Sequence, residues 1–424
     1  MGYVLKSSWA LLLGMFLLML GNGVQGTLLG IRGSLEGFSA GSMSLIMSGY
    51  FIGFLGGSRI APTLIRNVGH VRVFAALASF VSAALILYAA LPNEIVWFLL
   101  RILVGFCFSG IYVVAESWLN DSSTNETRGQ ALSAYLIVQM MGIVMAQWLL
   151  NFADAGGFIL FIIISVAVSL SFAPILLSVS PAPVFQTTKP MSLKELYVAS
   201  PLGVVGIFFL GGIFAALFGM TSVYGTEKGM SVGEISIFVG IIYVGGMLLQ
   251  YPIGWMSDRM DRRLLIIGIT VFGGVACLVA FTSASSLTIL LVCSFIIGGV
   301  ANPLYSLLLA YTNDFLDHDD MAAASGGLIF INGIGAIAGP LVVGWMMGQF
   351  GPDSFFLYIA LLLFVTSIYA FYRTFQRQAP SVDDTASYQP VFATASPVAV
   401  EVAQELSIEM ELEAEEDESA AEAS

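Results

Sequence analysis

The sequence predicts an all-α integral membrane protein, with twelve transmembrane helices arranged as two six-helix repeats. The 424-residue chain is 58% hydrophobic and only 10% charged, a balance too apolar for a soluble protein of this size. Apolar windows of about 20 residues, long enough to cross a bilayer, recur along the whole chain. A polar stretch in the middle divides them into two sets of six.

The spans leave almost no chain for a soluble domain. The first one follows Lys6 like a signal peptide, but no A-x-A cleavage site comes after it, so we expect a retained helix. The twelve spans are expected at 9–31, 40–62, 71–91, 95–119, 129–151, 156–178, 202–225, 232–256, 263–283, 286–311, 322–348 and 353–375.

The longest polar interruption, rich in Pro, Ser and Thr, separates the sixth span from the seventh. The sequence therefore predicts an N-terminal six-helix bundle at 1–178, a cytoplasmic linker at 179–201, and a C-terminal six-helix bundle at 202–375. An acidic disordered tail is expected at 376–424.

The two halves resemble each other in sequence. A shift of 193 positions aligns Gly105 with Gly298, Tyr112 with Tyr305, Asn120-Asp121 with Asn313-Asp314, and Gly142 with Gly335. Two six-span halves that share a topology are typical of rocking-bundle transporters, which hold their substrate between the halves near the bilayer midplane.

The basic residues predict the orientation. An even number of spans puts both termini on one side, and Lys and Arg are enriched in cytoplasmic loops. With cytoplasmic termini, twelve of the fifteen bases lie inside: Lys6, Arg59, Arg66, Arg72, Arg128, Lys189, Lys194, Arg259, Arg262, Arg263, Arg373 and Arg377. We expect a multi-pass protein of the cell inner membrane with both termini in the cytoplasm.

The net charge of −13 belongs to the tail, because twelve of the 28 acids lie between Asp383 and Glu422. Acids mixed with scattered apolar residues, without a sustained heptad, favour a solvated, disordered segment. Folding on a partner is the alternative for this tail.

Catalytic and metal-binding patterns are missing from the sequence. The three cysteines lie singly in apolar spans, and both histidines lie in loops. The Gly21-x-Gly23-x-x-Gly26 pattern lies within a span with no preceding strand, so it indicates helix packing rather than a dinucleotide site. We therefore expect no enzyme activity, no cofactor and no nucleic-acid partner.

The loop "QYPIGWMSDRMDRR" carries Gly254-x-x-x-Asp258-Arg259-x-x-Arg262-Arg263. This arrangement resembles the signature loop of the major facilitator superfamily. The resemblance implies that the Asp and the basic residues lock neighbouring helix ends together and separate when the transporter changes state. The alternative is that the arginines only anchor the topology.

In the equivalent first-half loop, Arg66 stands where Asp258 stands in the second half, so its arginines have no local acidic partner. Glu116 followed by Arg128-Gly129 resembles the Glu and Arg-Gly pair of sugar porters. We expect Glu116 to be a gate latch facing cytoplasmic arginines, with proton carrier and substrate ligand as alternatives. The expected gating residues are Glu116, Arg128, Arg66, Arg72, Asp258, Arg259 and Arg262.

Arg101 lies fifteen residues before Glu116, about 22 Å along a helix, so the two cannot pair. Arg101-x-x-x-Gly105 resembles a fourth-span motif whose arginine faces the central cavity. Snorkelling to the headgroups beside Trp97 is the alternative. The first span has Asn22 and Gln25 where antiporters often place an acid, so we expect Arg101 to be the counter-charge for an anionic group.

Other polar residues deep in the spans complete the expected cavity, although each could instead join helices by hydrogen bonds. The expected cavity residues are Arg101, Asn22, Gln25, Gln139, Tyr224, Tyr243, Asn302, Tyr305 and Asn332.

Within the superfamily, "ESWLN" followed by "TRGQALSAY", together with "QYPIGWMSDR", resembles the YcaD-like branch of bacterial transporters. The resemblance implies a major facilitator fold that moves a small solute by alternating access, with or without proton coupling. A facilitative uniporter and a non-transporting sensor that signals through the tail are the alternatives. The expected partners are a small-molecule substrate, the lipid bilayer and protons, and the expected state is a monomer.

Overall fold

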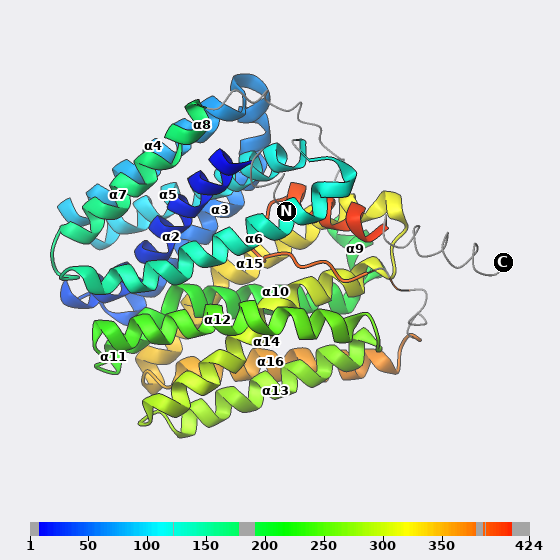
Figure 1. Cartoon of the computed structure of the whole chain (residues 1–424). Coiled ribbons are helices and arrows are strands. Elements are labelled where there is room, and N and C mark those ends of the chain that lie inside the picture. The colour runs from blue at the N-terminus through cyan, green and yellow to red at the C-terminus, as the bar shows by residue number, and fades with distance from the viewer. Residues whose placement is uncertain (1–7, 122, 178–190, 379–384, 386, 409–424) are drawn as a thin grey trace.

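The computed structural model describes residues 8–121, 123–177, 191–378, 385 and 387–408. Within these residues, twelve helices are long and apolar enough to cross a membrane. Figure 1 shows them as two bundles packed side by side. The predicted all-α membrane fold is confirmed.

The first bundle contains six long helices and two short additions. Its elements are α2 (Trp9–Leu35), α3 (Ala40–Val68), α4 (His70–Ala90), α5 (Glu94–Asp121), α6 (Asn125–Leu149), η1 (Leu150–Phe152), α7 (Ile159–Ser171) and α8 (Ala173–Leu177). Helix α9 (Leu193–Ala199) lies in the predicted linker, where Ser192 caps it and the Met191 amide donates to the Ala323 carbonyl at 3.0 Å.

The second bundle repeats the plan. Its elements are α10 (Pro201–Ala215), η2 (Ala216–Met220), α11 (Thr221–Glu227), α12 (Val232–Ser257), α13 (Arg262–Thr282), α14 (Leu287–Asn313), α15 (His318–Phe350) and α16 (Ser354–Thr374). The seventh span is not continuous α-helix, because η2 forms a single π-helical turn between α10 and α11. Such turns are rare and are frequent at functional sites.

The glycines that align in the two halves have the same structural role. A Cβ atom on Gly105 of α5 would lie 1.9 Å from the Tyr50 carbonyl oxygen of α3, and a Cβ on Gly298 of α14 would lie 2.0 Å from the Ile242 carbonyl oxygen of α12. Only glycine allows backbones to approach so closely. The sequence repeat therefore reflects one helix pair used in both halves.

The two ends of the molecule differ in how the halves meet. We call the end where α2 begins and α16 ends the terminal face, and the opposite end the distal face. Toward the distal face the halves are in direct contact: the Ser48 hydroxyl donates to the Ile337 carbonyl at 2.8 Å. Nearby, a Cβ on Gly344 of α15 would lie 2.3 Å from the Ser44 Cβ of α3.

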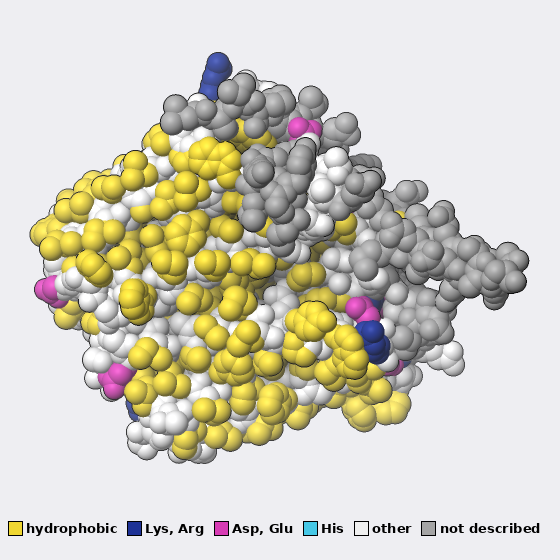
Figure 2. All heavy atoms as spheres, viewed as in Figure 1, with side chains coloured by type: hydrophobic (Ala, Val, Ile, Leu, Met, Phe, Trp, Pro, Cys, Tyr) yellow, Lys and Arg dark blue, Asp and Glu magenta, His cyan; other side chains and the backbone are white. Residues whose placement is uncertain are grey.

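The flank of the molecule is suited to lipid. Figure 2 shows hydrophobic side chains over most of the visible flank, with charged side chains toward the two ends. Large apolar side chains point outward on this surface, including Trp148 and Tyr251, which are 83% and 81% exposed. A bilayer would cover them.

The C-terminal segment differs from the expectation of disorder. Residues 387–396 run as irregular chain with a turn at Ala393 and Thr394, between the halves at the terminal face, and residues 397–408 form a helix there (Figure 1). Of residues 387–408, only Glu405 is exposed. Valine, alanine and serine, not acids, dominate this part, so it can be buried. Residues 409–424 of the predicted tail lie outside the described residues.

Candidate functional site: a central cavity and the vestibule below it

A cavity lies between the two halves near the middle of the spans. The space open to the centre of a water molecule is about 130 Å³, comparable with engineered protein cavities that hold one small aromatic molecule. Its walls come from α2, α3, α5 and α6 of the first half, and from α10, η2, α11, α12, α14 and α15 of the second. Most of the lining side chains are aromatic or aliphatic.

Arg101 is the one cation among the residues that line the cavity. Its guanidinium carbon lies 5.0 Å from the Tyr50 ring centroid, and an Nη atom lies 3.2 Å from the Met47 sulfur. The side chain is buried, its Nε has no hydrogen-bond partner, and none of the ion pairs among the described residues includes it. A cation is thus held in an apolar region without a counter-charge.

The snorkelling alternative placed Trp97 at the lipid interface. In the structure Trp97 is fully buried, its indole N–H donates to the Tyr88 carbonyl at 3.0 Å, and its ring packs edge-on against Phe38. Since Arg101 lies one turn farther along α5 and faces Tyr50, its side chain is directed inward, away from the headgroups.

Six of the nine expected cavity residues line the cavity: Arg101, Asn22, Gln139, Tyr243, Asn302 and Asn332. The other three do not. Gln25 is buried against the Tyr88 hydroxyl at 3.4 Å, and the Tyr224 hydroxyl donates to Asp353 at 3.3 Å toward the distal face. Tyr305 is buried on α14 outside the cavity.

Sequence reasoning missed the aromatic walls. Tyr50, Phe54 and Tyr112 face Phe214 and Phe218 across the space. In a membrane protein, apolar rings are expected equally on lipid-facing and inward-facing sides, so composition alone does not select them. The π-helical turn, which carries Phe218, has no sequence signature that we used.

A second hollow opens sideways between α6 and α12. It is lined by Leu136 and Ile137 on one side and by Met247 and Trp255 on the other. Met140 and Phe392 line both this hollow and the central cavity, so the two spaces adjoin. The flank of the molecule at this point faces the bilayer.

Below the cavity, at the terminal face, lies a space that we call the vestibule, defined by Glu116, Arg128, Asp258, Ser306 and Asn332. Residues 387–408, which we call the docked segment, occupy it. Phe392, Ala393 and Thr394 of this segment form the cavity floor.

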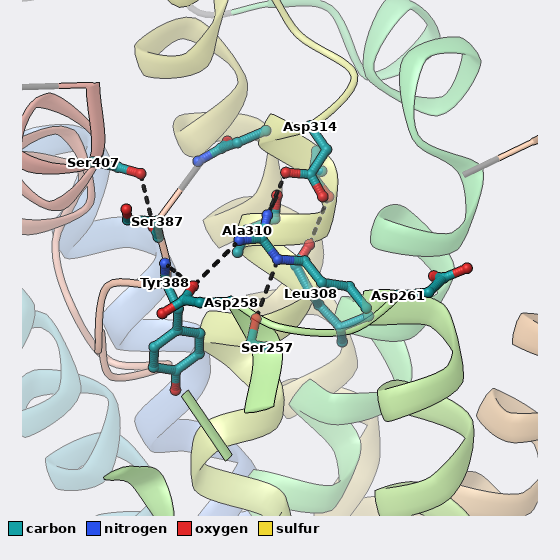
Figure 3. A network of polar contacts seen from close by, with 12 residues as sticks. Ser257, Asp258, Asp261, Leu308, Ala310, Asp314, Ser387, Tyr388 and Ser407 are labelled. Atoms are coloured by element: carbon teal, nitrogen blue, oxygen red, sulfur yellow. Dashed lines mark hydrogen bonds and ion pairs between the residues drawn. The ribbon is translucent and has the colours of Figure 1, made fainter. Parts of the chain in front are cut away.

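Two of the expected gating residues, Asp258 and Arg262, belong to one polar network. Figure 3 labels Ser257, Asp258 and Asp314 of this network. Arg262 is buried, pairs with Asp314 at the end of α14, and donates to the Ser257 hydroxyl at 3.1 Å. Asp258 lies farther from Arg262, at 3.7 Å, and accepts a hydrogen bond from the Tyr388 amide at 2.7 Å. Asp314, which the sequence did not single out for gating, is the closest acidic partner.

Three other expected gating arginines, Arg66, Arg72 and Arg259, lie on the surface. Arg259 stacks on Trp255 with 4.5 Å between its guanidinium carbon and the ring centroid. Arg66 approaches the Thr63 hydroxyl at 3.4 Å, and Arg72 is exposed. None of these three makes an ion pair among the described residues.

Glu116 lines a small hollow together with Arg128, but it makes no ion pair with an arginine among the described residues, contrary to expectation. Its carboxylate accepts from the Tyr135 hydroxyl at 3.1 Å and from the Ser396 amide at 2.9 Å. Arg128, its predicted companion, instead pairs with Glu405 at 2.6 Å. Both residues therefore contact the docked segment, which sequence reasoning treated as a solvated tail.

The chain has relatives over most of its length. It is 28% identical over 365 residues to the "Uncharacterized MFS-type transporter YcaD" of Escherichia coli O45:K1 (strain S88 / ExPEC), covering 84% of this chain and 92% of that protein. It is 26% identical over 378 residues to an "Uncharacterized MFS-type transporter" of Yersinia pestis (strain Pestoides F), covering 87% and 96%. The predicted resemblance to the YcaD-like branch is confirmed.

Solved structures share the fold. The nucleoside transporter NupG (D323A mutant) superposes with a TM-score of 0.72 at 16% identity, covering 86% of this chain and 99% of that one. A bacterial homologue of the human lysosomal transporter Spinster, described as inward-facing and occupied, gives 0.73 at 16% identity, covering 92% and 99%.

The family model described as Major Facilitator Superfamily matches residues 11–248 and 202–403. These matches cover both bundles and reach into the docked segment. The chain belongs to the Major Facilitator Superfamily and is a multi-pass membrane protein that acts as a secondary transporter, not as an enzyme.

Proposed function

We propose that the protein transports a small organic anion with an apolar or aromatic body, and that Arg101 binds the anionic group. The observation that carries this proposal is the position of Arg101: a buried guanidinium at the cavity wall, with a partnerless Nε and no carboxylate paired to it among the described residues.

A buried cation without a counter-ion is costly in a membrane interior, and such residues are by default candidates for a functional role. An anionic solute in the cavity would supply the missing charge. Guanidinium groups bind carboxylate and phosphate groups in a bidentate way, which adds direction to the attraction. Tyr50 stacks against Arg101 and would orient it toward the solute.

The remaining cavity wall indicates the rest of the solute. Phe54, Tyr112, Phe214 and Phe218 offer ring faces, and Asn22, Gln139 and Asn302 offer amide groups. Pockets of this composition hold ligands by apolar contact and fix their orientation with a few polar groups. The hollow between α6 and α12, open toward the bilayer, also favours a solute that is partly apolar.

The contacts between the two halves indicate which state of the alternating-access cycle the structure represents. The contacts of Ser48 with Ile337 and of Ser44 with Gly344 close the distal side, so we assign the structure to a state whose cavity faces the terminal side. Moving to the other state requires breaking these contacts and bringing the halves together at the terminal face. Asp258, Arg262 and Asp314, at the ends of α12, α13 and α14, lie where that closure would occur.

We assign the terminal face to the cytoplasm of a bacterial inner membrane, because most basic residues outside the spans gather there; among the described residues, Arg32 and Lys228 are the bases at the distal helix ends. We propose a monomer. The carboxylate available for proton coupling is Glu116, the one acid buried within a membrane span among the described residues.

The test is a thermal-stability screen of the detergent-purified protein with matched pairs of solutes, each a carboxylic acid and its neutral amide. A ligand that binds the folded state raises the melting temperature. We expect acids, but not their amides, to stabilise the protein, and Arg101→Met to abolish the effect. Lys194→Gln, at an exposed base in the linker helix, is the matched control and should keep it. Equal stabilisation by acid and amide would contradict the proposal.

A further inference from the structure

We infer that the vestibule is a binding site for the chain's own residues 387–408, and that this docked segment arrests the transporter by holding the halves apart at the terminal face. The inference depends on alternating access, which belongs to the family, and not on the charge of the solute. It can therefore fail or hold independently of the anion assignment.

The docked segment is bonded to the second half along its irregular part. The Ser306 hydroxyl donates to the Val391 carbonyl at 3.0 Å and accepts from the Val391 amide at 2.9 Å. The Asn332 side chain donates to the Ala393 carbonyl at 3.1 Å. Side chains of the membrane bundle thus satisfy backbone groups of a buried segment that has no regular structure of its own to pair them.

The same segment is bonded to the first half. Glu116 of α5 accepts from the Ser396 amide at 2.9 Å, at the start of the helix formed by residues 397–408. One turn from the end of that helix, Glu405 pairs with Arg128 of α6 at 2.6 Å, and Leu406 lies 3.7 Å from where a Cβ on Gly129 would be. The segment thus bridges both halves.

Its side chains are buried like those of a core helix. Val400 is 0% exposed and Ala403 is 2% exposed. Gln404 is held from three sides, because it accepts from the Ser325 hydroxyl and donates to the Asn313 side chain and to the Met321 carbonyl, at 3.0, 3.1 and 3.2 Å. A loosely attached acidic tail would not show this burial or this complement of bonds.

The segment also closes back on itself. The Ser407 hydroxyl donates to the Ser387 carbonyl at 2.7 Å, which joins the two ends of the docked segment (Figure 3). At its entry, the Tyr388 amide donates to Asp258, and the Tyr388 ring covers Gly254, where an added Cβ would lie 2.6 Å from a ring carbon. The segment is therefore a compact unit fitted to α12.

These positions conflict with transport. Phe392, Ala393 and Thr394 form the cavity floor, so the segment stands between the cavity and the terminal opening. Closing the terminal face would bring together Glu116 of the first half and Asn332 of the second, and the segment lies bonded between them. It must leave the vestibule for the halves to approach. Asp258, freed of Tyr388, would then be available to the first half.

Docking is tested first by cross-linking, in a protein whose three cysteines are replaced. Gly129→Cys with Leu406→Cys should cross-link through a short bis-maleimide in inverted membrane vesicles without solute. Gly268→Cys, on the lipid-facing side of α13, replaces Gly129→Cys in the control pair and should not cross-link. Absence of the first cross-link, in protein shown by size-exclusion chromatography to be folded, overturns the inference.

The arrest is tested by maleimide labelling of a single cysteine at Ile329, on the cavity wall. Truncation after Gln378 removes the docked segment, and truncation after Ile408 keeps it, so the two form a matched pair. The first should raise the labelling rate from the cytoplasmic side about tenfold or more, and the second should leave it near that of the full chain. Equal rates in both truncations would refute the arrest.

The charge pair provides a test that does not require truncation. Arg128→Glu and Glu405→Arg should each raise the labelling rate about two- to fivefold, because a partly exposed ion pair contributes up to about 1 kcal/mol. The double reversal should restore slow labelling. A synthetic peptide of residues 385–408, added to the protein truncated after Gln378, should slow labelling at high concentration, since it lacks the tether that raises local concentration. If neither the double reversal nor the peptide slows the labelling of Ile329→Cys, the claim that the vestibule binds the docked segment is contradicted.

Discussion

The Glu116 carboxylate accepts a hydrogen bond from the backbone amide of Ser396, 280 positions later in the chain, at 2.9 Å. A buried acid in the fourth span is thus satisfied by the C-terminal segment and not by an arginine. This hydrogen bond links the expected gate residue to the docked segment, so a substitution at Glu116 should change how stably the segment is bound.

Replacing Glu116 should therefore loosen the docked segment. Hydrogen bonds to charged acceptors contribute about 1.5–3 kcal/mol, so Glu116→Ala should speed hydrogen exchange of the Ser396 amide by roughly tenfold or more. Glu116→Gln keeps an acceptor and should have a smaller effect. Glu94→Ala, at the exposed distal end of the same helix, is the control and should leave this amide unchanged. Unchanged exchange in Glu116→Ala would show that the bond does not hold the segment.

Arg101→Met should stabilise the solute-free protein while abolishing anion binding. Methionine is an unbranched apolar side chain two atoms shorter than arginine, so the contact with Tyr50 becomes apolar and the unpaired charge disappears. Even a buried ion pair can be replaced by apolar residues with a gain in stability of about 1–4 kcal/mol, and Arg101 has no ion pair to lose among the described residues. The check is the melting temperature in detergent without solute. A marked fall in the melting temperature would indicate that Arg101 stabilises the solute-free protein through a structural partner, which would contradict a ligand-binding role.

Asp314 should matter more for stability than Asp258, although Asp258 stands in the signature loop. Asp314 and Arg262 are both buried, with 2% of each side chain exposed, whereas 38% of the Asp258 side chain is exposed. Asp314→Asn removes the closest acidic partner of a buried guanidinium and should cost up to about 3–5 kcal/mol. Asp258→Asn should cost about 1 kcal/mol or less. Thermal unfolding of the two variants, measured side by side, distinguishes them, and equal losses would contradict this ranking.

The close approach of α3 and α5 predicts a sharp difference between two glycines. Gly105→Ala places a Cβ 1.9 Å from the Tyr50 carbonyl oxygen, so the helices must separate. Gly268→Ala, in α13, meets nothing within 4 Å and should be neutral or slightly stabilising, since alanine favours a helix. We expect poor yield and a lower melting temperature for Gly105→Ala alone. Equal behaviour of the two variants would mean that the helix contact tolerates a methyl group.

Much of the fold could be predicted from the sequence, because the bilayer requires apolar spans of a certain length and the glycine repeat marks the helix pairs. Inward-facing side chains were harder to identify. Asn22 lines the cavity, whereas Gln25, less than one turn later on α2, is buried against Tyr88. Periodicity does not separate such positions when lipid and protein core are equally apolar.

The docked segment could not be predicted because its composition differs from that of the acidic residues that follow it in the same tail. The eight acids among residues 409–424 dominate the composition of the tail and indicate disorder. The stretch "VFATASPVAVEVA", Val391 to Ala403, is instead small and apolar. Its partners, Ser306, Asn332 and Glu116, lie on helices far away in the chain, so no local pattern reveals them.

The most direct test of the central claim is the initial rate of uptake of the best-binding acid into proteoliposomes. It is measured for the protein truncated after Gln378, with and without Arg101→Met, and for the full chain. We predict saturable uptake by the truncated protein, slower uptake by the full chain, and uptake no faster than empty liposomes for Arg101→Met in the truncated protein. Equal uptake with and without Arg101 would contradict the assignment of the cavity to an anion.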